Sequence, residues 1–188
     1  MRDVYEYCPE FKGERFLLRP VSLEDCTALL KVYSDERAVP FFNNDNCHGD
    51  DFHYTTVERM RSAINFWQYS YVHRYFVRWS IVDQASGEAI GTIELFNRRA
   101  DDWFENCGIL RLDLRSDYER TEIIREILEL IIPQAYILFD CDRLATKAVS
   151  LAAERIAALE QMGFAACSEK LIGHDGTAYG DYFAKAKG

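Results

Sequence analysis

The chain has 188 residues, of which 48% are hydrophobic and 28% charged, and this composition excludes intrinsically disordered and fibrous proteins. Lys and Arg total 22 against 31 Asp and Glu, and the net charge of −9 argues against a protein that binds nucleic acid or an anionic membrane, because either would need a basic face. The six cysteines form no C-x-x-C pair, so they indicate neither a disulfide framework nor a zinc site.

The hydropathy pattern predicts neither a targeting segment nor a membrane span. Residues 1–8 lack the apolar core of a signal peptide. The most apolar stretch, residues 123–139, contains charged residues and Pro133, which makes it unsuited to cross a bilayer. We therefore expect a soluble, cytoplasmic protein. Because no repeat or flexible linker divides the sequence, we expect one domain over residues 1–188.

The amino-terminal part predicts a strand followed by two helices. Ser22 can cap the first helix, and the capping-box pattern Thr55-x-x-Glu58 opens the second. The segment between them is polar and rich in turn formers, which predicts a loop. In chain order, the expected elements are a strand over 15–20, a helix over 22–35, a loop over 43–53 and a helix over 55–72.

Three strands are predicted next. Residues 75–83 and 89–97 are rich in β-branched and aromatic side chains and are separated by a turn, so they predict a hairpin. Residues 107–114 alternate cleanly between two faces. One face of this strand carries Ile109, Arg111 and Asp113, and the other carries Leu110, Leu112 and Leu114.

The carboxyl-terminal part predicts a long helix, a strand, a helix and a final pair of strands. The capping-box pattern Ser116-x-x-Glu119 opens the long helix, and Pro133 either kinks it or starts a new turn. The core face of this helix carries Ile123, Ile124, Ile127, Leu128 and Ile131. The remaining expected elements are a strand over 144–149, a helix over 152–162 that Gly163 ends, and an antiparallel pair over 164–172 and 179–185. This order indicates a mixed α/β fold, with one sheet and helices on both faces.

Four segments, taken in this order, resemble the GCN5-related N-acetyltransferases (GNAT), in particular the branch that acetylates ribosomal-protein N-termini and small-molecule amines. They read RFLLRPVSLEDCTALLKVYSDERAV, ASGEAIGTIELFN, LRSDYERTEIIREIL and AALEQMGF. The resemblance runs from Arg15 nearly to the end. It implies a twisted, mostly antiparallel sheet in which a central parallel pair, 107–114 and 144–149, splays apart. It also implies acetyl transfer from acetyl-CoA to a primary amine, on a small molecule or a protein N-terminus, by a monomer or homodimer.

The resemblance also implies where acetyl-CoA would bind. In the family, the strand before the long helix pairs with the pantetheine arm, and the following loop offers backbone N–H groups to the pyrophosphate. The cofactor-binding residues implied for this sequence are Leu112, Leu114, Arg115, Tyr118, Arg120, Thr121, Glu122 and Arg155.

The sequence departs from the family in the pyrophosphate loop. The family pattern is Gln/Arg-x-x-Gly-x-Gly/Ala, but here Arg120 and Glu122 replace both glycines and Glu119 replaces the Gln. Together with Asp117, the two glutamates would meet a diphosphate with like charge, which costs on the order of 1 kcal/mol or more. Arg115 and Arg120 could compensate as direct phosphate ligands.

The last predicted helix departs from the family as well. The family often has Asn and, three residues later, Ser at its start, and a tyrosine acid four residues before the Gly. Ala152, Arg155 and Leu159 stand at these positions. The family's general acid is therefore missing from its usual place.

Two carboxylates are the candidate general bases. Glu94 and Asp113 lie on strands near the expected cleft, where either could deprotonate an amine directly or through water. The alternative is that each is a structural carboxylate, with Asp113 paired to Arg111 or exposed to solvent. Tyr182 could line the same cleft or simply pack in a strand.

Two further groups of residues have alternative interpretations. The polar loop over 43–53 suggests an EF-hand only in a register that places Thr55 where a bidentate Glu belongs, so we predict no metal site. The aromatic run over 66–76 could line an acceptor pocket, or form core or a dimer face.

The sequence therefore supports two functions of different classes. The first is an acetyl-CoA-dependent N-acetyltransferase that acts on an amine. The second is a catalytically lapsed protein that keeps the fold as a ligand-binding or protein-interaction module. The loop over 116–122 discriminates between them, because only the enzyme requires its amides to be open to phosphate.

Overall fold

The computed structural model describes residues 3–188 and is built on an eight-stranded sheet with the strand order β1-β2-β3-β4-β5-β6-β10-β7. Only the β5–β6 pair is parallel among the strands of this sheet; the other neighbours are antiparallel. The strands are β1 (Phe11–Lys12), β2 (Phe16–Pro20), β3 (Val77–Asp83), β4 (Glu88–Arg98), β5 (Cys107–Leu114), β6 (Arg143–Lys147), β7 (Ala165–Ala166) and β10 (Tyr182–Ala186).

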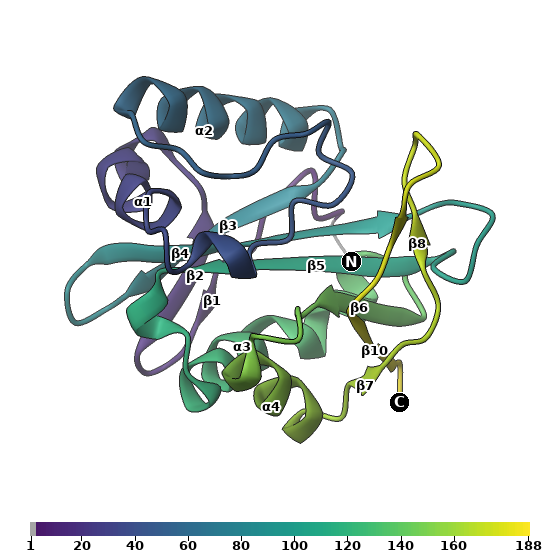
Figure 1. Ribbon diagram of the computed structural model, residues 1–188. Helices are drawn as coiled ribbons and strands as arrows, with labels where there is room; N and C mark the ends of the chain where they lie inside the picture. Colours follow the sequence, from purple (N-terminus) through teal and green to yellow (C-terminus); the bar gives the residue numbers. More distant parts are fainter. Residues whose placement is uncertain (1–2) are drawn as a thin grey trace.

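Helices cover both faces of this sheet (Figure 1). On one face lie α1 (Cys26–Tyr33) and α2 (Val57–Val72); on the other lie α3 (Thr121–Leu138) and α4 (Ala153–Gln161). Three short 3₁₀ turns, at Leu23–Asp25, Val39–Phe41 and Ser116–Tyr118, connect the elements. The predicted class is therefore confirmed: a mixed α/β fold with a mostly antiparallel sheet and helices on both faces.

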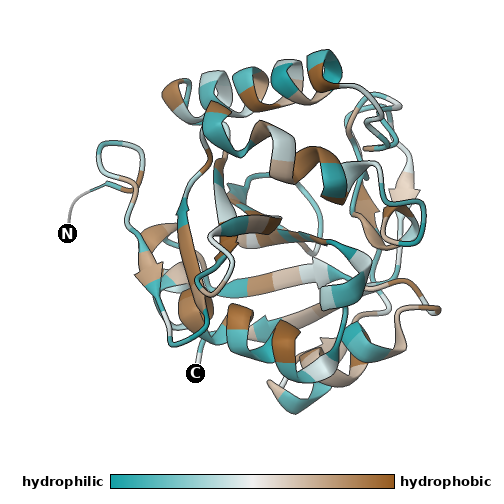
Figure 2. Ribbon diagram, turned by 90° about the vertical axis from the view of Figure 1, so that its left-hand side faces the viewer, coloured by the Kyte–Doolittle hydropathy of each residue, from teal (hydrophilic) through white to brown (hydrophobic). Residues whose placement is uncertain are grey.

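The core is divided by the sheet into two main layers. Apolar side chains of α3 and α4 pack against one face, and α1 and α2 pack against the other around Leu29, Tyr33 and Trp67. In Figure 2 the strands carry apolar stretches, whereas the helices alternate between apolar and polar residues. Leu110, Leu112 and Leu114 of β5 face the α3 layer, as the alternation predicts.

The parallel pair splays, which is the feature that shapes the site. Pairing between β5 and β6 runs from Cys107–Arg143 to Leu110–Thr146 and stops there, although β5 continues to Leu114. The prediction of a splayed parallel pair joined by the long helix is confirmed. The last residues of β5 thus border a gap on the β6 side.

Two helix starts differ from the predicted ones. The cap of α2 is Thr56, one residue after the predicted Thr55, and its side chain accepts a hydrogen bond from the backbone N–H of Arg59 at 3.2 Å. The long helix α3 begins at Thr121, so the predicted capping box at Ser116 is wrong. The segment from Ser116 forms a 3₁₀ turn instead, and α3 runs without interruption through Pro133.

The carboxyl-terminal strands are also more divided than predicted. The expected pair over 164–172 and 179–185 is split into β7–β10, in the main sheet, and a separate hairpin of β8 (Leu171–Ile172) and β9 (Ala178–Tyr179). This hairpin rises beside the carboxyl-terminal end of β4 and the amino-terminal end of β5 (Figure 1). Gly163 follows α4 with φ +82°, the left-handed conformation predicted for the end of that helix.

No helix within residues 3–188 is long and apolar enough to cross a membrane. In the same residues, no group of three or more His, Cys, Asp or Glu side chains is arranged to hold a metal ion.

Candidate functional site

The gap beside the end of β5 is filled by the side chain of Arg155, which projects from the first turn of α4. Arg155 is 1% exposed. Its Nη1 donates to the backbone oxygen of Leu112 at 2.8 Å and to that of Phe41 at 2.9 Å. Its Nε and Nη2 donate to the two carboxylate oxygens of Glu119 at 2.7 and 2.8 Å. The polar groups of the gap are thus satisfied by the chain itself.

The loop that leads into α3 uses its own backbone amides in the same way. The N–H of Ser116 donates to Asp35 Oδ2 at 3.0 Å, and the N–H of Thr121 donates to Glu154 Oε2 at 2.8 Å. The Thr121 hydroxyl donates to the same Glu154 oxygen at 2.5 Å. A carboxylate from α4 therefore occupies the end of α3 that attracts anions.

A depression of about 420 Å³ lies over this loop and the start of α4. Its charged side chains are acidic apart from one arginine. The lining residues are Arg37, Phe41, Ser116, Asp117, Glu119, Leu151, Ala152, Ala153 and Glu154. Among the described residues, the only guanidinium in its lining is that of Arg37, so this surface offers a diphosphate little positive charge.

Two of the other residues that the sequence suggested for cofactor binding are bound to carboxylates of the protein. Arg115 pairs with Asp117, Nε to Oδ1 at 2.7 Å, which raises the pKa of the guanidinium. The Tyr118 hydroxyl donates to Asp83 at 2.7 Å. The side chains of Leu112 and Leu114 are buried in the core. Arg120 stands at the N-cap position of α3 without a side-chain cap hydrogen bond and is exposed, as is Glu122 in the first turn.

On the other face of the sheet, the strand register builds a charged ladder. Arg78 on β3 lies opposite Glu94 on β4, and Glu94 lies opposite Arg111 on β5. Glu94 is 1% exposed, and its Oε2 is ion-paired with Arg78 while its Oε1 lies 2.7 Å from Arg111 Nη1. Burial alone would raise the pKa of Glu94, but the two guanidiniums outweigh it and lower the pKa. A carboxylate held in this way is a weak proton acceptor.

Asp113 lies two residues after Arg111 on β5 and is completely buried. Its Oδ2 accepts hydrogen bonds from the Tyr33 hydroxyl at 2.8 Å and from Arg78 Nη1 at 3.1 Å. Burial raises the pKa of Asp113, although Arg78 opposes that rise. Tyr33 and Arg78 thus bind this carboxylate in the core. That Glu94 and Asp113 act as bases stays a prediction.

Tyr182 joins a second buried cluster between β10, β6 and the loop after α1. Its hydroxyl donates to Asp45 Oδ2 at 3.1 Å, and Lys147 Nζ lies 2.6 Å from Asp45 Oδ1. Arg111 Nη2 donates to the backbone oxygen of Asp45 at 2.8 Å. These contacts fasten the polar loop over 43–53 to the sheet.

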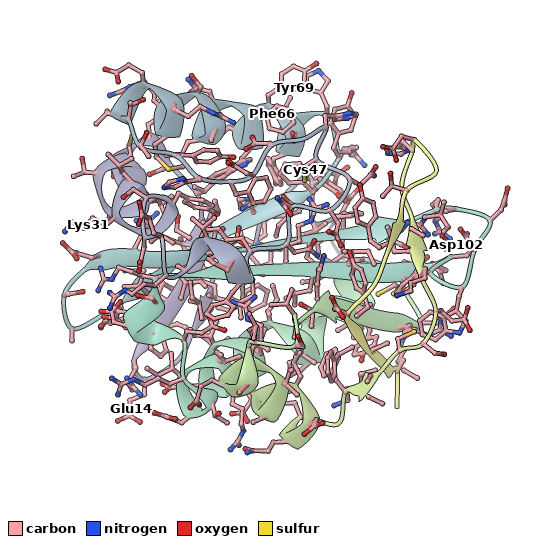
Figure 3. All side chains as sticks on the ribbon, in the orientation of Figure 1. Glu14, Lys31, Cys47, Phe66, Tyr69 and Asp102 are labelled. Carbon is pink, nitrogen blue, oxygen red and sulfur yellow. The ribbon has the colours of Figure 1, made fainter. Side chains whose placement is uncertain are left out.

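Beneath α2 lies a cavity of about 480 Å³, which we call the aromatic pocket. It is enclosed by α2, the loop before that helix and the strands β3 to β5, and the turn of the β8–β9 hairpin reaches its edge. In Figure 3, Cys47 lies below α2, and Phe66 projects from that helix. The lining residues are Asn46, Cys47, His48, Asp50, Phe52, Tyr54, Arg59, Ala63, Phe66, Trp67, Tyr75, Phe76, Arg78, Glu94, Phe96, Arg111 and His174.

Sequence reasoning missed three residues of this region. Arg78 links Glu94 to Asp113, Tyr33 reaches Asp113 and Arg78 from α1, and Glu154 accepts from the first amide of α3. A charged residue inside the apolar run of 75–83 was the available signal for Arg78. Nothing local marks Glu154, because its contact joins two elements 33 residues apart.

Comparisons with known proteins agree with this architecture. The model of the acetyltransferase (GNAT) domain family matches residues 15–165. No curated protein matches the sequence. Among solved structures, the ribosomal-protein-S5-alanine acetyltransferase of Vibrio fischeri is 17% identical, with a TM-score of 0.69 over 95% of this chain and 96% of its own.

Two further structures are similar to the same extent. Mycobacterium smegmatis RimJ, solved in complex with CoA-disulfide, is 16% identical, with a TM-score of 0.71 over 95% of this chain and 86% of its own. A GNAT-family acetyltransferase of Bacillus anthracis is 13% identical, with a TM-score of 0.67 over 95% and 98%. At these identities the likeness concerns the fold.

The residues present do not fit the acyl-CoA that acetyltransferases of this kind generally use. A pantetheine arm would need the backbone of β5 beside the splay, where Arg155 holds the Leu112 oxygen. A pyrophosphate would need free amides before α3, where Asp35 and Glu154 accept from two of them. In both halves of the expected channel, side chains of the protein thus take hydrogen-bonding groups that the cofactor would use.

Proposed function

The chain belongs to the GNAT acetyltransferase family, and we propose that it is a ligand-binding member of that family whose acyl-CoA channel has lapsed. Acetyl transfer is the activity of the family in general. In this chain, the fold and the aromatic pocket remain, while the place of the acyl donor is taken by side chains. The proposal thus favours the second of the two functions that the sequence supports.

The observation that carries this proposal is the ion pair of Arg155 and Glu119 in the splay. To admit a pantetheine arm, Arg155 would have to leave four hydrogen bonds, and Glu119, whose side chain is 7% exposed, would lose its charged partner. Separating a buried ion pair costs about 3–5 kcal/mol. That cost alone would weaken acyl-CoA binding by a factor on the order of 10² to 10⁴.

The buried carboxylates support the same conclusion. An amine acceptor needs a base within hydrogen-bond reach of its proton. Both oxygens of Glu94 are ion-paired with arginines, and Asp113 is enclosed by Tyr33 and Arg78. The ion-paired Glu94 is therefore a poor acceptor for the proton of an amine. Asp113 keeps Oδ1 without a partner within the described residues, but it does not line the aromatic pocket.

One observation favours the alternative, an acetyl-CoA-dependent N-acetyltransferase that acts on the primary amine of a small molecule or a protein N-terminus. The pairing of β5 with β6 stops at Leu110, so the splay that an acyl-CoA enters is still present in the backbone. In that case Arg155 would have to swing out of the gap when the donor binds.

An assay of free-thiol release from acetyl-CoA distinguishes the two functions. The acceptors are polyamines, aminoglycosides and peptides with free N-termini, tested at pH 7.5. We expect no release above the background hydrolysis of acetyl-CoA. Amine-dependent release would overturn the proposal, and the variants Glu94→Gln and Asp113→Asn would then show which carboxylate acts as the base.

A further inference from the structure

We infer that the aromatic pocket takes a small organic anion, a carboxylate on an aromatic body, and that it discriminates against amines. This inference rests on the proposed function, since it names the ligand class of the pocket that the protein keeps. It differs from what the family resemblance implies for the acceptor, which is an amine. The inference is drawn from the charges and hydrogen bonds of the pocket lining.

The body of the ligand follows from the rings that form the walls. Seven of the lining residues are aromatic. Phe66 and Tyr75 are 56% and 58% exposed, so they form the mouth, whereas Trp67 is only 4% exposed and lies deeper. The volume of about 480 Å³ suits a ligand of one or two fused rings. Ring stacking against such walls favours a flat aromatic body.

The carboxylates of the pocket are closed to an amine. Asp50 Oδ1 accepts the backbone N–H of Phe52 at 2.9 Å, and its Oδ2 accepts the Tyr54 hydroxyl at 3.0 Å and is ion-paired with Arg59. Both oxygens of Glu94 are ion-paired with arginines, as described above. All four carboxylate oxygens of the lining therefore already accept from the protein. Because both carboxylates are already paired with guanidiniums, an ammonium group would find no unpaired negative charge among the described residues of the lining.

The arginines of the lining, in contrast, include hydrogen-bond donors that have no acceptor within the described residues. The Nε–H groups of Arg78 and Arg111 are buried and have no partner within the described part of the chain. Arg59 lies over the ring of Tyr54, 4.2 Å from its centroid, and its side chain is 44% exposed. These three arginines, set against Asp50 and Glu94, leave the lining with one excess positive charge.

Asp113 is outside this count. It is ion-paired with Arg78 from the buried side and does not line the pocket. The charge of the lining residues is thus opposite in sign to the net charge of −9 of the chain. A carboxylate would balance this charge and accept from the exposed guanidinium of Arg59 at the mouth.

Three probes with the same ring system test the charge preference: indole-3-acetate, indole-3-acetamide and tryptamine. Their dissociation constants are measured by calorimetric titration of the full chain. We expect the carboxylate to bind at least about tenfold more tightly than either of the others. Tighter binding of tryptamine, or no binding of the carboxylate up to about 1 mM, would overturn the inference.

A pair of arginine variants tests the cause. Arg59→Met removes the exposed cation at the mouth and leaves Asp50 without its ion pair, so we expect indole-3-acetate to bind at least about fivefold more weakly and tryptamine more tightly. Arg61→Met is the matched control, because Arg61 is exposed on the same helix and does not line the pocket. Opposite shifts for the two probes cannot arise from a general loss of folding. Equal effects of the two variants would contradict the assignment.

A pair of ring variants tests the location. Phe66 and Tyr69 project from α2 (Figure 3) and are both more than half exposed, but only Phe66 lines the pocket. We expect Phe66→Ala to weaken indole-3-acetate binding and Tyr69→Ala to leave it unchanged; the reverse would place the ligand elsewhere. Because acetyl-CoA is absent from these titrations, their outcome is independent of whether the acyl-CoA channel has lapsed.

Discussion

Arg155 and Glu119 are 36 residues apart in the sequence, yet they form a bidentate ion pair in the gap beside β5. Each stands where the GNAT resemblance leads one to expect another residue, Ser for Arg155 and Gln for Glu119. The two departures are linked, because each buried charge is neutralised by the other. A filled channel is the structural result.

The first prediction is that these two residues are strongly coupled in stability. Arg155→Ser leaves Glu119 buried without a cation and is expected to lower the free energy of unfolding by about 3–5 kcal/mol. The double variant Arg155→Ser/Glu119→Gln is expected to lose less than the sum of the single losses, by about 1–3 kcal/mol. Urea unfolding of the four proteins measures the coupling.

The exposed ion pair of Arg125 and Glu129, on α3, is the control for that cycle. Because both side chains are in contact with solvent, we expect a coupling of about 0.5 kcal/mol or less. Additive losses at Arg155 and Glu119 would mean that the buried pair does not hold the gap closed.

The second prediction concerns the pH dependence of stability at Glu94. Its pKa in the folded protein lies below the ordinary value of 4.5, so the unfolded chain binds this proton more readily. The stabilisation from ionised Glu94 is therefore complete above about pH 4.5 and is lost as the pH falls through the lowered folded pKa. We expect Glu94→Gln to be clearly destabilising at pH 7 and much less so near pH 3. Urea unfolding at both pH values checks this, and a difference that grows at low pH would contradict the ion-paired state.

The third prediction uses Cys47 as a reporter in the wall of the aromatic pocket. Burial raises the pKa of its thiol to about 11. Since only the thiolate is alkylated, the iodoacetamide rate at Cys47 should still rise about tenfold per pH unit between about pH 8 and pH 10. In urea the rate should level off near the ordinary pKa of about 8.5. Peptide mass spectrometry follows both rates, and a plateau in the folded protein below about pH 10 would contradict the buried position.

The strands and the face of β5 that carries Arg111 and Asp113 were predictable from the sequence, because a period of two residues is a local pattern. The β5–β6 parallel pair was predictable for a different reason: a helix of sufficient length for a crossover separates the two strands. The start of α3 was not predictable. Ser116 and Glu119 match a capping box locally, but Glu119 is bound by an arginine from another helix.

The site was predictable only in part. The departures at positions 119 and 155 were visible in the sequence, but their contact was not, because it depends on how α4 packs beside the loop. Arg78 could not be assigned to Glu94 and Asp113 before the register of β3, β4 and β5 was known. The local charge of the aromatic pocket likewise depends on side chains from several separate segments.

Calorimetric titration with acetyl-CoA is the decisive measurement for whether Arg155 and Glu119 close the acyl-CoA channel. We expect no detectable binding to the wild-type protein up to about 1 mM, and measurable binding once Arg155→Ser/Glu119→Gln restores the residues expected from the family. Binding of acetyl-CoA to the wild-type protein with a Kd of about 10 μM or lower would contradict this closure.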